Sequence, residues 1–174
     1  MSIDAFDSSL TRTIQNWPPL LQPIMIAASF LGLPLVLIVV AVAAALTSWR
    51  YAHPRIALGF VAGLVGLCLN TMLKLYFQRA RPDTLYATGM HVKSFSFPSG
   101  HAYGGMVVYG LFAVLAYKYL PQPWNTLVSL ALALLIILIG LSRIYLGAHY
   151  PTDVVAGWAL GAMTLLVIIL VIKP

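Results

Sequence analysis

The chain has 174 residues, of which 61% are hydrophobic and only 8% are charged. Soluble domains carry about 25% charged residues, so this composition excludes an ordinary soluble domain and indicates an integral membrane protein. Ten Lys and Arg against four Asp and Glu give a net charge of +6, but the chain has no basic run or soluble basic face, so we expect no nucleic-acid partner and assign the surplus to anionic lipid or substrate.

Residues 1–18 are predicted to form an amphipathic helix that lies in the membrane interface. Apolar side chains recur at helical spacing, at Ile3, Phe6, Leu10, Ile14 and Trp17. Polar residues separate them, and two prolines end the pattern. The alternative is a cap folded on the end of a bundle. The segment begins with acids and has no basic region before an apolar core, so we do not expect a secretory signal peptide.

Five uncharged stretches follow, each close to the roughly 20 residues that cross a hydrocarbon core of about 30 Å. The predicted transmembrane helices cover residues 24–47, 56–76, 100–119, 124–144 and 152–172. Because backbone in hydrocarbon must satisfy its own hydrogen bonds and period-2 alternation is absent, these spans are helices rather than barrel strands. The predicted fold is all-α: a single polytopic membrane domain over residues 1–174, with about five transmembrane helices plus the interfacial helix. Pro34 is expected to kink the first span.

Two glycine pairs, Gly59 with Gly63 and Gly157 with Gly161, have the small-xxx-small spacing that lets membrane helices approach closely. Packing within the bundle is the favoured interpretation, and dimerisation is the alternative. The sequence does not define the oligomeric state.

Helices that alternate in direction bring every polar cluster of the chain to one face of the membrane. That face receives Lys74, Arg79, Arg81, Asp83, Ser99, His101, Arg143, His149 and Asp153. The opposite face receives Arg50, His53, Arg55, Lys118 and Lys173. The first cluster is therefore the candidate functional site.

Its residue types suit an oxyanion with several charged oxygens. Lys74, Arg81 and Arg143 supply three cations, and arginine offers planar forks that match phosphate oxygens. Lys74 and Arg81 are seven residues apart, which places them on one face of a helix, although Pro82 biases Arg81 out of helix. Ser99 is predicted to cap the next helix, so free first-turn amides and the helix dipole would face the same pocket, and Gly100 would let phosphate come close.

Two histidines are the candidate reactive groups. His149 lies between Gly147, an expected helix end, and Pro151, a favoured first helical residue. Asp153 follows four residues later and could hold one imidazole nitrogen, leaving the other free to attack. His101 could protonate the leaving oxygen as a general acid. These duties require neutral His149 and protonated His101, which predicts a bell-shaped dependence of rate on pH.

Three blocks, Lys74-x6-Arg81-Pro82, Pro98-Ser99-Gly100-His101 and Ser142-Arg143-x5-His149-x3-Asp153, resemble the complete signature of the type 2 phosphatidic acid phosphatase (PAP2) superfamily. The resemblance spans residues 74–153 and implies a metal-independent reaction through a phosphohistidine at His149, oriented by Asp153. It assigns acid and base duty to His101. It also assigns phosphate binding to Lys74, Arg81, Ser99, Gly100 and Arg143. The chain departs from many six-span members in having five predicted spans.

Other interpretations of these residues stay open. Lys74 and Arg143 could be interfacial residues that extend toward water. Two histidines and an aspartate could bind a metal, but the surrounding cations would repel a divalent ion, so we expect neither metal nor cofactor. Five further polar residues match no signature position and are predicted to lie in a solvated loop: Arg79, Asp83, Tyr86, His91 and Lys93.

An apolar bundle with its site at the surface favours a lipid whose tail stays in the bilayer while its phosphate enters the site. Undecaprenyl pyrophosphate, phosphatidylglycerophosphate and phosphatidic acid all fit. A lipid phosphotransferase could use the same residues, and a phospholipid transporter or flippase is the alternative from another class. With the three candidate phosphate ligands set aside, the basic-loop count favours a site on the outer face, by four cytoplasmic basic residues to three. The family resemblance also implies an external site, so we expect a bacterial inner membrane with the active face outward.

Overall fold

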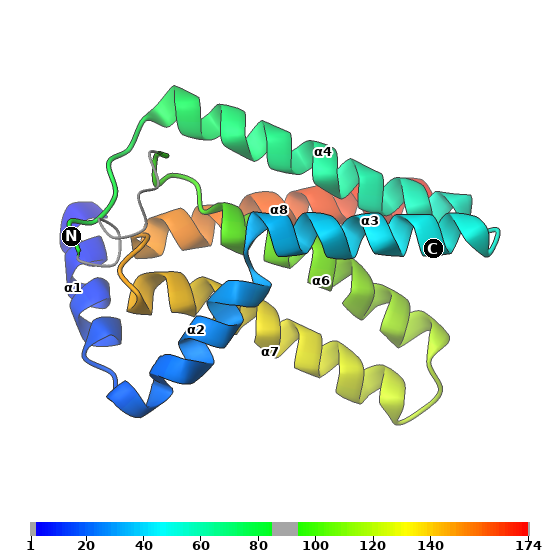
Figure 1. The fold of residues 1–174 in the computed structure, drawn as a ribbon, viewed down its shortest axis with the longest axis horizontal. Coiled ribbons are helices and arrows are strands. Elements are labelled where there is room, and N and C mark those ends of the chain that lie inside the picture. Colours follow the sequence, from blue (N-terminus) through cyan, green and yellow to red (C-terminus); the bar gives the residue numbers. More distant parts are fainter. Residues whose placement is uncertain (1–2, 85–93, 174) are drawn as a thin grey trace.

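Helices make up nearly all of the computed structural model, which describes residues 3–84 and 94–173 (Figure 1). No strand occurs in this part of the chain, which confirms the predicted all-α class. The elements in order are α1 (Ile3–Gln15), η1 (Pro19–Leu21), α2 (Gln22–Leu31), α3 (Pro34–Arg50), α4 (Pro54–Phe77), α6 (Gly100–Tyr119), α7 (Trp124–Tyr145) and α8 (Pro151–Ile172).

Four helices, α4, α6, α7 and α8, are long and apolar enough to cross a membrane within the described residues. The stretch predicted as a single first span, residues 24–47, instead contains two helices: the pair η1–α2 and α3 is bent by 53°. The break falls at Gly32 and Leu33, and Pro34 is the first residue of α3. Proline lacks an N–H but is tolerated in the first turn of a helix, so it begins a new helix here rather than bending a continuous one. The number of spans is five if the bent pair counts as one.

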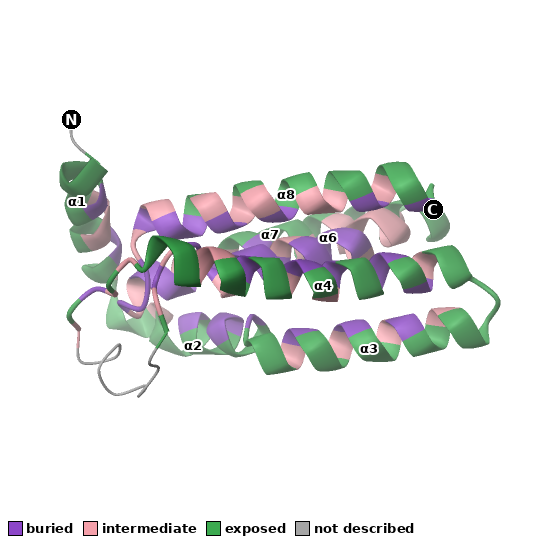
Figure 2. Cartoon of the chain, turned by 90° about the horizontal axis from the view of Figure 1, so that it is seen from above, coloured by how far each residue is buried: buried purple, intermediate pink, exposed green. Residues whose placement is uncertain are grey.

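Helix α6 lies at the centre of the bundle and contacts α3, α4, α7 and α8. The core around it includes the fully buried Leu37, Leu111 and Ile139, whereas the outward faces of α3 and α4 are largely exposed, as expected of lipid-facing surfaces (Figure 2). A Cβ atom on Gly157 of α8 would lie 2.6 Å from the carbonyl oxygen of Ser99. This glycine spacing therefore serves close packing of α8 on α6 within the bundle.

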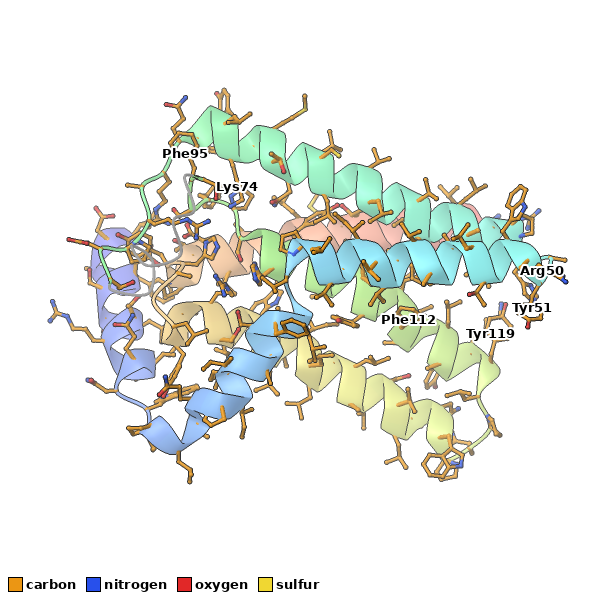
Figure 3. All side chains as sticks on the ribbon, viewed as in Figure 1. Arg50, Tyr51, Lys74, Phe95, Phe112 and Tyr119 are labelled. Atoms are coloured by element: carbon orange, nitrogen blue, oxygen red, sulfur yellow. The ribbon has the colours of Figure 1, made fainter. Side chains whose placement is uncertain are left out.

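The two ends of the bundle differ in their residues. Lys74 and Phe95 lie close together at one end, and Arg50, Tyr51 and Tyr119 lie at the other (Figure 3). The cluster predicted from alternating helix directions is thus gathered at the first end.

Helix α1 lies crosswise over that same end of the bundle (Figure 1). It packs on α7 and α8 through Ile14, which is 3% exposed, with Leu10 and Trp17 beside it. Ile3 and Phe6 stay 69% and 37% exposed. The helix therefore covers the end of the bundle, while Ile3 and Phe6 stay exposed on its surface. Its placement in the membrane interface stays a prediction.

Candidate active site

The turn between α7 and α8 presents His149. Gly147 adopts a left-handed conformation with φ of 73°, which glycine reaches without steric cost. The backbone N–H groups of Ala148 and His149 then both donate to the carbonyl oxygen of Arg143, at 2.9 and 3.1 Å. These two hydrogen bonds therefore fix the backbone position from which the His149 side chain extends.

Asp153, in the first turn of α8, meets the His149 ring. Its Oδ2 lies 3.3 Å from His149 Nδ1 and accepts a hydrogen bond from the Tyr150 N–H at 3.0 Å. Both side chains are buried, at 2% and 0% exposure. A carboxylate on Nδ1 fixes the tautomer and leaves Nε2 as the nitrogen with a free lone pair. The structure thus brings the predicted pair together, while their catalytic roles stay a prediction.

Arg81 lies on the other side of the His149 ring. Its Nη1 is 3.4 Å from His149 Nε2 and donates to the Ala148 carbonyl oxygen at 2.8 Å. Its Nε donates to the Ser94 carbonyl oxygen at 2.8 Å. The sequence-based placement of Lys74 and Arg81 on one helix face is wrong, because α4 ends at Phe77 and Arg81 follows in a segment without helix or strand. The expected bias of Pro82 against helix at Arg81 agrees with this. The loop, rather than helical spacing, brings Arg81 to the site.

The other two predicted cations are held by nearby oxygens. Lys74 Nζ donates to the carbonyl oxygens of Phe95 and Ser96, at 3.0 and 3.1 Å. Arg143 is 2% exposed and donates from Nη1 to the Ser29 hydroxyl of α2. Sequence analysis missed Ser29, because only the bend between α2 and α3 brings it beside α7.

Ser99 caps α6 as predicted: its Oγ accepts from the Ala102 N–H at 3.4 Å. Its own N–H donates to the Asp153 carbonyl oxygen at 2.9 Å. This bond joins the start of α6 to the start of α8, so Gly100 and the first-turn amides lie beside the His149–Asp153 pair.

His101 follows in the same first turn of α6. The positive charges of Arg143, Arg81 and Lys74 act on its ring. Its Nε2 is buried and has no hydrogen-bond partner among the described residues. A buried nitrogen without a protein partner is available for a bound oxygen.

The electrostatics of the site keep His149 neutral. Burial lowers the pKa of His149 from 6.5 to about 3; the hydrogen bond to Asp153 opposes this, and the charges of Lys74, Arg81 and Arg143 add to it. Burial also lowers the pKa of Arg81, and the charge of Arg143 lowers it further. The site is therefore a positive pocket around an unprotonated imidazole, which suits a polyanionic ligand.

The prediction that Arg79 lies in a solvated loop is wrong. Its Nη1 is 2.7 Å from Asp153 Oδ1, and its Nη2 is 2.6 Å from Asp7 Oδ2 of α1. Sequence analysis also missed Asp7. One signal could have found it: Asp7 lies on the apolar face of α1, four residues after Ile3 and three before Leu10, and an acid there needs a buried partner.

The remaining loop residues divide in two groups. Asp83 is exposed, as the solvated-loop prediction requires. The other three lie outside the described residues: Tyr86, His91 and Lys93.

Comparisons with known proteins identify the family and several relatives of this chain. A family model described as "PAP2 superfamily" matches residues 54–174. Phosphatidylglycerophosphatase B of Bacillus subtilis (strain 168) is 37% identical over 139 residues, covering 79% of this chain and 65% of that relative. Lipid A 1-phosphatase of Rhizobium johnstonii is 36% identical over 123 residues, covering 66% and 45%. The chain thus spans less than two thirds of the length of these relatives.

A solved structure resembles the whole fold. The transmembrane PAP2-type phosphatidylglycerolphosphate phosphatase from Bacillus subtilis has a TM-score of 0.80 and 28% sequence identity. The match covers 95% of this chain and 84% of that one.

The low pKa of His149 predicts how acid affects stability. Between pH 6.5 and about 3 the unfolded chain binds a proton at this ring that the folded protein does not, so the stability contribution is complete above pH 6.5 and is lost as the pH falls toward 3. We expect the Tm in detergent to fall between pH 7 and 4.5, and to fall less steeply in His149→Gln. His53→Gln changes an exposed histidine at the opposite end and should keep the wild-type slope. Equal slopes in all three proteins would contradict the assignment.

Proposed function

The chain belongs to the PAP2 superfamily, and we propose that it is a metal-independent phosphoric ester or anhydride hydrolase that removes phosphate from a membrane lipid through a phosphohistidine at His149. One observation carries the proposal: a buried His149–Asp153 pair lies among the cations Lys74, Arg81 and Arg143 at one end of an apolar helix bundle. Binding alone would not need an oriented, neutral imidazole.

The first step joins His149 to phosphorus. With its Nδ1 proton on Asp153, His149 attacks through Nε2, the N–P bond forms and the bond from phosphorus to the leaving oxygen breaks. The transferred group carries negative charge on its three equatorial oxygens. Lys74, Arg81 and Arg143, with the first-turn amides beyond Ser99, supply the donors that stabilise this charge. His101 gives a proton to the leaving oxygen.

The second step releases phosphate. His101, now neutral, takes a proton from water as the water oxygen attacks phosphorus, and the N–P bond breaks to return neutral His149. The imidazolium character of the intermediate is stabilised by ionised Asp153. Because the pKa of His149 is lowered to about 3, protonation of its ring does not limit the reaction between pH 5 and 9.

A groove on the lipid-facing side supports a lipid substrate. It lies between α3 and α4, measures about 380 Å³ and is lined by Pro34, Ile38, Leu64, Leu67, Cys68, Asn70, Thr71, Lys74 and Gly100. Apolar residues form most of it, and the two phosphate-binding candidates Lys74 and Gly100 close one end. A lipid whose acyl or prenyl tail lies in this groove would have its phosphate at the site. A free sugar phosphate has no tail and would not need the groove.

Three lipids are the candidate substrates: undecaprenyl pyrophosphate, phosphatidylglycerophosphate and phosphatidic acid. The names of the relatives, a phosphatidylglycerophosphatase and a lipid A 1-phosphatase, support the class of phosphorylated membrane lipids.

The chain is a multi-pass membrane protein, and we place it in the inner (plasma) membrane of a bacterium with the site facing the outside or periplasm. The distribution of basic residues supports this orientation: Arg50, Arg55, Lys118 and Lys173 fall at the end opposite the site. Cytoplasmic loops carry an excess of Lys and Arg.

Phosphate release tests the reaction. Purified protein in detergent with EDTA should release inorganic phosphate from at least one of the three lipids, and His149→Ala should lower the rate by at least about 10³-fold because the nucleophile is lost. His53→Ala, at the opposite end, is the matched control. Loss of activity in EDTA, or wild-type activity in His149→Ala, would contradict the proposal. Transfer of the phosphoryl group to a second lipid without phosphate release would identify a phosphotransferase.

Filling the groove tests the lipid tail. Leu64→Trp should lower kcat/KM for dioleoyl phosphatidic acid by about tenfold, since a misfitted apolar contact costs about 1–3 kcal/mol, and should change kcat/KM for the dihexanoyl lipid much less. Val65→Trp introduces the same side chain at the neighbouring position, which is 57% exposed, and should change kcat/KM for neither lipid. Equal losses on the two lipids would show that the tail does not use the groove.

A further inference from the structure

Arg79 connects the orienting carboxylate to the N-terminal helix. Its Nη1 donates to Asp153 Oδ1 and to the Thr152 hydroxyl, both at 2.7 Å, and its Nη2 donates to Asp7 Oδ2 at 2.6 Å. The guanidinium lies over the Tyr150 ring, 4.3 Å from its centroid. The side chain is 26% exposed, whereas the carboxylates of Asp7 and Asp153 are at most 2% exposed. An arginine fork is rigid, so these contacts define its position well.

Asp7 also binds the start of α8 directly. Its Oδ1 accepts from the Thr152 N–H at 2.9 Å, and its Oδ2 accepts from the Thr152 hydroxyl at 2.6 Å. Thr152 is the second residue of α8, and its N–H is one of the donors that a helix cannot satisfy internally. A carboxylate at this place is favoured by the helix dipole. Asp7 therefore acts as a cap for α8 although it lies on α1, 145 residues away in the sequence.

Together these bonds leave Asp153 a single orientation. Arg79 holds Oδ1, while Oδ2 meets the Tyr150 N–H and His149 Nδ1. Rotation of the carboxylate would break contacts on both oxygens. The charge of Asp7 also matters. Because Asp7 offsets the positive charge of Arg79, the negative charge of Asp153 still acts on the His149 ring. Burial acts to lower the pKa of Arg79, but the bonds to Asp7 and Asp153 outweigh it and raise that pKa, so the guanidinium stays charged.

We propose that Asp7 and Arg79 are positioning residues for phosphoryl transfer, which act through Asp153 to hold the His149 ring with Nε2 directed at phosphorus. Helix α1 thereby completes the active site. This inference rests on the proposed function. Neither residue is a signature position: Arg79 falls at an unspecified position of the first block, and Asp7 lies outside all three blocks.

A purely structural role for the same contacts makes a different prediction. If they only fasten α1 to the bundle, their loss would lower Tm and leave kcat of the remaining folded protein unchanged. If they position Asp153, kcat falls even well below Tm, and KM changes little because Lys74, Arg81 and Arg143 still bind phosphate.

The test uses charge-removing variants of the full chain in detergent, assayed well below their Tm. Asp7→Asn keeps the shape and can still accept from Thr152, but it loses the charge that faces Arg79. We expect kcat to fall roughly 10- to 100-fold, the range expected when a reacting group is slightly misplaced, with KM within about twofold. Asp4→Asn removes the same charge from an exposed position of α1 and should keep wild-type kcat. Asp7→Glu, which retains the charge, should retain more of kcat than Asp7→Asn.

A double-mutant cycle identifies the path. Because both residues act through one carboxylate, Asp7→Asn combined with Arg79→Gln should be little slower than Arg79→Gln alone. If Asp7→Asn does not fold, Arg79→Lys keeps the cation without the fork, and the same fall in kcat is expected.

The outcomes separate this inference from the proposed function. The first measurement is phosphate release from lipid by the wild type and by His149→Ala. No release by the wild type would overturn both the proposed function and the positioning role. Wild-type release with an unchanged kcat in Asp7→Asn would overturn the positioning role alone. So would a rise in KM at constant kcat, or fully additive losses in the double mutant.

Discussion

The Asp153 carboxylate is buried completely, and the rest of the site depends on how its charge is paired. An ionised carboxylate removed from water is costly unless hydrogen bonds and opposite charge compensate it. Here the compensation comes from three groups: the Tyr150 N–H, the His149 ring and the guanidinium of Arg79, which Asp7 of α1 holds in turn. The same contacts that make the buried charge tolerable also set the direction of His149 Nε2. Stability and chemistry therefore share one network.

The helix packing brings these parts together. The short turn after α7 leaves the five residues 146–150 between two helices, so His149 cannot move far from Asp153. Close approach at Gly157 lets the carbonyl of Ser99 lie against α8, and the Ser99 N–H reaches the Asp153 carbonyl. The start of α6 thus lies against the start of α8, which carries Asp153. Burial, and then the cations of the site, keep His149 unprotonated, and the same cations suit a polyanionic ligand.

Much of this was predictable from local sequence. Apolar length predicted the helices, alternating direction predicted a single polar end, and the Ser99 cap and the four-residue spacing of His149 and Asp153 follow from backbone geometry. The rest depends on contacts between distant segments. The bond from Arg143 to Ser29 joins residues 114 apart, and that from Arg79 to Asp7 joins residues 72 apart. No periodicity specifies such pairs, nor the 53° bend that places α2.

The most direct measurement is to locate the phosphoryl group during turnover. Wild-type protein mixed with a lipid labelled with ³²P in the transferred phosphate, quenched within milliseconds under alkaline conditions, should carry label on His149 alone. Within that ring the phosphorus should be on Nε2, because Nδ1 faces Asp153, and the two phosphohistidine isomers can be separated by chromatography. Label on Nδ1 or on another residue, or turnover with no labelled protein at any time, would contradict the mechanism.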